Sequence, residues 1–170
     1  MSENRIKFKK ERITLGILFI SLMLISSICF LIVPEKFIRN VFMKIEHIQI
    51  VGVLGILYFS TLLYSFLAIL PRKYAIIISD DFLIDNSKYE SLGKIKWTDI
   101  SGIKRFKKRN IEISLKVDLY SSEKRSLLKK FLTFMHNWNN NNRILISSAI
   151  TDSNIEALYE EIKNAYRTSK

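Results

Sequence analysis

The sequence predicts a membrane α-helical hairpin joined to an α+β domain, mainly antiparallel β, that ends in a C-terminal helix. Three observations lead to this fold class. Two long apolar runs without charged residues lie within the first 70 positions. After Tyr74 the hydrophobic pattern changes to short runs with a period of two, which is typical of half-buried β-strands. The end of the chain returns to a helical period.

The two apolar runs are long enough to cross a lipid bilayer. Ile13–Val33 contains 21 residues and Ile48–Leu70 contains 23. At about 1.5 Å per residue, each helix covers a hydrocarbon core of about 30 Å. A buried helix of a soluble protein is the alternative, but two such runs in one small chain disfavour it. A cleavable signal peptide is a second alternative for the first run, which is too long and ends at Pro34 and Glu35.

The distribution of cations predicts that both termini lie in the cytoplasm. Residues 1–12, a basic N-terminal segment, contain five Lys and Arg side chains. The connecting loop 34–47 contains three, offset by two Glu side chains, whereas the domain 71–170 carries 19 Lys and Arg against 12 Asp and Glu. Because Lys and Arg accumulate on the cytoplasmic side of membrane proteins, we expect the loop to be a short external connection.

The polar residues of the two spans, and the lack of charged ones, limit the functions that the spans can have. We expect hydroxyl groups to form hydrogen bonds across the hairpin, from Ser21, Ser26, Ser27, Ser60 and Thr61. Neither span contains an Asp, Glu, Lys, Arg or His. Intramembrane charges mark ion paths and proton relays, so their absence argues against a transporter or channel. The single cysteine, Cys29, excludes an intrachain disulfide and a cysteine-based metal cluster.

Short strands are predicted through most of the domain, at residues 73–79, 81–85, 91–97, 100–106, 111–120 and 143–148. The clearest is "IEISLKVDLY", in which Ile111, Ile113 and Leu115 point to one face and Glu112 and Ser114 to the other. The strands 100–106 and 111–120 are expected to form a hairpin about Arg109-Asn110.

Two amphipathic helices are predicted after these strands. In residues 122–138, with Ser121 or Ser122 as cap, an apolar stripe is expected to cover the sheet, although an interfacial helix is an alternative because Lys129 and Lys130 adjoin it. The stripe is Leu127, Leu128, Phe131, Leu132, Met135 and Trp138. The final helix is expected to bury Ile155, Leu158, Tyr159, Ile162, Ala165 and Tyr166.

The segment "DDFLIDNSKYESLGKIKWTDISGI" resembles bacterial pleckstrin-homology-like (PH-like) domains, in which a bulged strand pair leads into G-x-I-x-W-x-D-I. The matching residues are Gly93, Ile95, Trp97, Asp99 and Ile100. The layout of two spans followed by this domain is similar to an uncharacterised bacterial family of two-span proteins. The resemblance implies a PH-like fold in a bacterial cytoplasmic (inner) membrane, a structural role for the motif, and no known active site.

One turn carries an unusual density of positive charge. The sequence "IKRFKKRN" contains Lys104, Arg105, Lys107, Lys108 and Arg109. Anionic lipid headgroups, an acidic protein partner and simple solvation are the alternatives. A nucleic-acid site is disfavoured because only one aromatic residue is interleaved with the cations.

The sequence contains no metalloprotease, P-loop, nucleophile-elbow or glycine-rich nucleotide motif, so no catalytic residue, metal or cofactor is predicted. The expected function is therefore that of a non-enzymatic integral membrane protein whose cytoplasmic PH-like domain is a binding or scaffold domain for a protein partner or an anionic lipid surface. The alternative is a membrane immunity protein that acts against a bilayer-targeting toxin.

Overall fold

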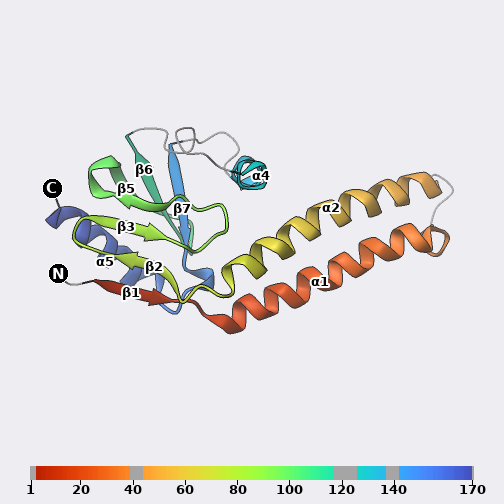
Figure 1. Cartoon of the computed structure of the whole chain (residues 1–170), viewed down its shortest axis with the longest axis horizontal. Helices are drawn as coiled ribbons and strands as arrows, with labels where there is room; N and C mark the ends of the chain where they lie inside the picture. The colour runs from red at the N-terminus through yellow and green to blue at the C-terminus, as the bar shows by residue number, and fades with distance from the viewer. Residues whose placement is uncertain (1–2, 39–43, 117–125, 137–141, 170) are drawn as a thin grey trace. The chain divides into compact units, whose positions relative to one another are not determined.

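The computed structural model describes residues 3–38, 44–116, 126–136 and 142–169, and the chain divides into two compact units (Figure 1). One unit is a helical hairpin, Glu11–Leu70. The other combines Met1–Lys10 with Pro71–Lys170 and is called the domain below. The hairpin is thus inserted into the sequence of the domain.

The helical unit consists of α1 (Lys10–Ile32) and α2 (Ile45–Ile69), with the short helix η1 (Pro34–Phe37) after α1. Both long helices are long and apolar enough to cross a membrane, and each begins three residues before the apolar run predicted from sequence. Their large apolar side chains are mostly exposed: Leu22 is 59% exposed and Leu57 is 63% exposed. This exposure favours membrane helices over the core helices of a soluble protein, which bury such side chains.

Small residues allow α1 and α2 to approach each other. A Cβ atom at Gly52 would lie 3.0 Å from the Ser27 carbonyl oxygen, and one at Gly55 would collide with the Ser27 hydroxyl. The predicted hydrogen bonds across the hairpin are wrong for Ser26, Ser27 and Thr61. Each of these hydroxyls donates to the carbonyl four residues earlier in its own helix, which satisfies the group without a partner helix.

The domain contains a four-stranded antiparallel sheet, which begins with a strand that the sequence analysis did not predict. The strands are β1 (Asn4–Lys7), β2 (Tyr74–Ile78), β3 (Phe82–Asp85) and β4 (Gly93–Lys96), in that order. Figure 1 shows β1, in red, beside β2. Beyond β1, Phe8 bridges to Thr151 and the Lys9 N–H donates to the Ile150 carbonyl. The basic segment before the first apolar helix is therefore part of the domain.

A second, three-stranded antiparallel sheet is formed by β5 (Ile100–Phe106), β6 (Asn110–Leu115) and β7 (Arg143–Ser147), with β6 in the centre. The predicted hairpin between β5 and β6 is confirmed, and Ile111, Ile113 and Leu115 are buried as expected. Glu112, predicted to point to the other face, is buried as well, with a side chain that is only 2% exposed. Residues 117–120 of the predicted strand lie outside the described residues.

The C-terminal helix α5 (Ile155–Thr168) contacts β2 of one sheet and β6 of the other, and so covers both. Asn154 caps it by accepting a hydrogen bond from the Glu156 N–H. Ile155, Leu158, Ile162 and Tyr166 are buried as predicted, whereas Tyr159 and Ala165 are half-buried. The Tyr166 hydroxyl donates to the Ile100 carbonyl at 3.2 Å, which ties the end of α5 to β5.

The remaining helix, α4 (Leu127–His136), differs most from its prediction. Of the predicted stripe, Leu132 is buried, but Leu127, Phe131 and Met135 are exposed. The two sheets and α5 already bury the core of the domain, so most of this stripe has no core to cover. Trp138 and the proposed caps Ser121 and Ser122 lie outside the described residues.

Candidate functional site

The basic turn connects β5 and β6, whose register pairs Arg105 with Ile111 and Phe106 with Asn110. Lys107 begins the turn in the left-handed region, with φ of 56°. Non-glycine residues adopt this conformation infrequently, mostly in tight turns. The turn therefore presents Lys107, Lys108 and Arg109 as three consecutive exposed cations.

Lys104 compensates a buried carboxylate. In the register of the hairpin it lies opposite Glu112, and its Nζ is 3.1 Å from Glu112 Oε1. Arg143 Nε of β7 lies 3.4 Å from the same oxygen. Neither contact has the geometry of a hydrogen bond, so this oxygen is held by charge and not by a directed bond. A buried carboxylate without opposite charges would be strongly unfavourable, which gives Lys104 a structural role.

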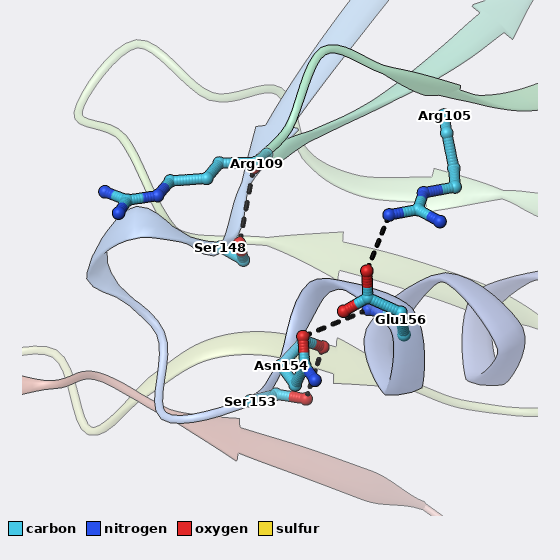
Figure 2. A network of polar contacts seen from close by, with 6 residues as sticks. All are labelled: Arg105, Arg109, Ser148, Ser153, Asn154 and Glu156. Atoms are coloured by element: carbon cyan, nitrogen blue, oxygen red, sulfur yellow. Dashed lines mark hydrogen bonds and ion pairs between the residues drawn. The ribbon is translucent and has the colours of Figure 1, made fainter.

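Arg105 joins the turn to the C-terminal helix. Its guanidinium donates to Glu156 Oε1 at 2.7 Å, and Figure 2 shows this pair bridging β5 and the first turn of α5. Both side chains are about half exposed, so the pair contributes about 0.2–1 kcal/mol to stability. Its charge is nevertheless offset by a neighbour.

The end of the turn is fixed through the backbone of Arg109. Its carbonyl accepts hydrogen bonds from the Ser148 N–H at 2.9 Å and from the Ser148 hydroxyl at 3.3 Å. Ser148 begins the short helix η3 (Ser148–Ile150) after β7. In Figure 2 the Arg109 guanidinium points away from both Ser148 and Glu156. The backbone is thus anchored while the charge is directed outward.

The five predicted cations therefore divide into two groups. Lys104 and Arg105 form ion pairs inside the domain. Lys107, Lys108 and Arg109, called the basic tip below, form no ion pair with a carboxylate among the described residues. The tip is therefore a smaller cationic surface than the sequence predicts, with three exposed charges.

The motif residues lie away from the basic tip, where β4 turns into β5. Gly93 has φ of +76°, a conformation that favours glycine, at the start of β4. Ile95, Trp97 and Ile100 are buried. Trp97 begins the short helix η2 (Trp97–Asp99), and its Nε1–H donates to the Ser79 carbonyl at 2.8 Å. The Asp99 carbonyl accepts from the Lys116 N–H at 2.8 Å. These contacts give the motif a role in packing.

A second charged cluster surrounds Tyr74, at the start of β2. Arg5 Cζ of β1 and Lys73 Nζ lie 5.4 Å and 5.3 Å from the centroid of its ring. Hydrogen bonding to Arg5, followed by hydrogen bonding to Lys73, lowers the pKa of the Tyr74 hydroxyl. Sequence reasoning missed this cluster because Arg5 reaches Tyr74 only through the pairing of β1 with β2. The alternation in "NRIK" was its one local indication, and four residues are too few for a period to be recognised.

No metal centre competes with the basic tip in the parts of the chain that the structure describes. Among these residues, no group of three His, Cys, Asp or Glu side chains is arranged to hold a metal ion. A hollow of about 580 Å³ lies elsewhere, between β1, the turn after β2 and the end of α5. Its charged side chains are Glu3, Asp80 and Glu161, so it disfavours anions.

No protein-family model, curated protein or solved structure matches the chain. Its class follows from its architecture alone. Two helices long and apolar enough to cross a membrane are combined with a domain of two antiparallel sheets and a C-terminal helix.

Proposed function

We propose that this is a non-enzymatic integral membrane protein of the bacterial inner membrane, with two spans and a cytoplasmic PH-like domain that binds an anionic lipid surface through its basic tip. The observation that carries the proposal is the insertion of an exposed apolar hairpin between two paired strands, β1 and β2, of one charged domain. The hairpin is the anchor, and the domain is the binding part.

The pairing of β1 with β2 supports a topology with both ends of the hairpin on one side of the membrane. The chain leaves the domain after Lys10 and returns to it at Pro71. Two membrane crossings return the chain to the side that it left, whereas a single crossing does not. The excess of Lys and Arg in residues 1–12 and 71–170 supports the cytoplasm as that side.

The PH-like assignment is supported by the combination of antiparallel strands and a closing C-terminal helix, together with the buried Trp97 in the G-x-I-x-W-x-D-I motif. The acidic turn Ser79-Asp80-Asp81 disfavours a headgroup pocket between β2 and β3. The basic tip is the better candidate for anionic ligands.

Three charges are enough to orient a domain that is already tethered. Each cation near an anionic leaflet contributes about 1 kcal/mol, so the tip contributes about 3 kcal/mol. Recruitment from solution needs more than this, but the spans already hold the domain at the bilayer. An acidic protein surface is the alternative ligand for the same three charges.

The test compares two variants of the full chain with equal loss of charge. The tip variant carries Lys107→Gln, Lys108→Gln and Arg109→Gln, and the control carries Lys96→Gln, Lys116→Gln and Arg167→Gln, all exposed. Each is reconstituted in phosphatidylcholine vesicles with and without phosphatidylglycerol, and amide hydrogen exchange of residues 106–111 is measured. Anionic lipid should slow exchange in the native chain and the control, but not in the tip variant.

The same pair of variants identifies the ligand. An acidic protein is the ligand if two results are obtained together. Exchange in the native chain does not depend on anionic lipid, and a host protein that the native chain and the control capture is not captured by the tip variant. If neither dependence on anionic lipid nor such capture is observed, the tip is a solvated turn and the proposed binding function is wrong. Trypsin protection in right-side-out and inside-out vesicles tests the topology.

A further inference from the structure

The exposed apolar surface of the domain is concentrated on one helix. Within the described part of the domain, all large apolar side chains that are exposed belong to α4: Leu127 at 86%, Phe131 at 47%, Phe134 at 55% and Met135 at 44%. These positions are spaced by three, four, seven and eight residues, so they lie on one face of the helix. The face is continuous and apolar.

The other amphipathic helix of the domain shows that this exposure is specific to α4. In α5 the apolar positions Ile155, Leu158 and Ile162 are all buried, and the polar positions face outward. Among the α4 side chains that the structure describes, only Leu132 is fully buried, so this helix contributes much less to the core than α5 does. Large exposed apolar patches mark interaction sites in soluble domains.

The charge of α4 favours a lipid occupant for this face. The helix contains Lys129 and Lys130 and no Asp or Glu. Lys129 lies over the Tyr89 ring, with its Nζ 5.6 Å from the centroid, and Lys130 is exposed. A short helix with a cationic side and exposed Leu, Phe and Met residues has the composition of helices that lie in the headgroup region of a bilayer. Elsewhere in the described chain, large apolar side chains are exposed only in the helical unit.

We propose that α4 is an interfacial helix whose Leu127–Phe131–Met135 face inserts at the boundary between headgroups and acyl chains, in the leaflet next to the domain. The inference rests on the proposed function in one respect, namely that the spans hold the domain at a bilayer. It adds a second membrane contact, which is apolar, beside the electrostatic contact of the basic tip.

The experiment measures the depth of α4 in the full chain. In a Cys29→Ala background, a single cysteine is placed at Phe131 or Met135, or at the control position Glu160, which is exposed on α5. Each protein is labelled with an environment-sensitive fluorophore in detergent and reconstituted at low protein density in vesicles of phosphatidylcholine and phosphatidylglycerol. The labels at positions 131 and 135 should shift to the blue and be quenched by lipids with brominated acyl chains, whereas the label at 160 should remain accessible to iodide.

Two outcomes would overturn the inference. If the labels at 131 and 135 are as accessible to iodide as the label at 160, α4 faces water. If they are shielded from iodide but not quenched by brominated lipid, a protein surface or a second copy of the chain covers the helix. Sedimentation of the full chain with the vesicles separates these outcomes from failure of the proposed function, because a chain without spans stays in the supernatant.

A matched pair of variants tests the face without changing the labelled position. With the label at 135, Leu127→Gln combined with Phe131→Gln should reduce quenching by brominated lipid, whereas Glu160→Gln should not. Unchanged quenching in the double variant would show that the label, and not the helix face, enters the lipid. The tip variant should leave quenching intact, since the apolar contact is independent of the basic tip.

Discussion

Ile6 of β1 lies opposite Ile76 of β2, and both side chains are buried, although the whole helical hairpin separates them in the sequence. This pair shows that the domain is completed by residues that precede the first apolar helix. Folding of the domain therefore requires both ends of the hairpin to be held together.

Ile6→Ala is expected to destabilise the domain by about 2 kcal/mol, at the lower end for such a change because β1 is an edge strand. The measurement is chemical denaturation in micelles followed by tryptophan fluorescence, since both tryptophans lie in the domain sequence. Lys7→Ala, at an exposed neighbouring position, should have little effect. Equal effects from the two variants would contradict a structural role for β1.

The discontinuous domain changes how the hairpin can be removed. Deleting residues 1–70 also deletes β1, so this truncated chain is expected to aggregate or to lose its cooperative unfolding. Replacing residues 11–70 with a Gly-Ser linker keeps β1 and should give a folded, monomeric domain. The two proteins are compared by size-exclusion chromatography and amide exchange. The linker version also tests the alternative immunity function, which needs the spans, without unfolding the domain. A well-folded 71–170 fragment would contradict this account.

The structure explains why some elements are predictable from sequence and others are not. The apolar runs and the alternation around Ile111 and Ile113 can be recognised within a single stretch of sequence, because the pattern extends over the whole element. The strand state of β1 is not local, since Ile6 is buried only when β2 lies beside it. The pattern of α4 shows that one face is apolar but not what covers it, so burial of Phe131 could not be predicted.

The candidate site shows the same division. The density of cations at residues 104–109 is plain in the sequence. The pairing of Lys104 with Glu112 depends on the strand register. The pairing of Arg105 with Glu156 depends on the position of α5. Charge counting alone overestimates the charge available to a ligand.

The buried Glu112 gives a prediction with a definite order of effects. Lys104→Met with Arg143→Met leaves a buried carboxylate uncompensated and should cost about 2–3 kcal/mol, less than for a fully buried pair because both cations are half exposed. Adding Glu112→Gln to this double variant should restore most of the loss. Denaturation of the full chain in micelles measures each step. No recovery in the triple variant would mean that the cations stabilise by packing and not by charge.

The close approach of α1 and α2 predicts that bulk at Gly52 is harmful. A Cβ atom there meets a backbone oxygen, that of Ser27, which cannot move aside as a flexible side chain does. Gly52→Leu should destabilise the hairpin by about 1–3 kcal/mol through overpacking. Val53→Leu adds bulk to an exposed position of the same helix and is the control. Thermal loss of helical circular dichroism in micelles should begin earlier for Gly52→Leu alone; similar curves for both variants would contradict this packing.

The Tyr74 cluster predicts an early phenol titration. Hydrogen bonding to Arg5, and then to Lys73, lowers the pKa of Tyr74 below its ordinary value of 10.0. The folded state is therefore favoured increasingly as pH rises through the lowered pKa toward 10.0, and this contribution is lost as pH falls through the lowered pKa. The phenolate absorbance of the native chain minus that of Tyr74→Phe should rise below pH 10.0. Arg5→Gln should move this difference toward the ordinary value more than Lys73→Gln does, because the Arg5 bond is the larger cause. A difference that titrates at the ordinary value in the native chain would show that β1 does not bring Arg5 to Tyr74.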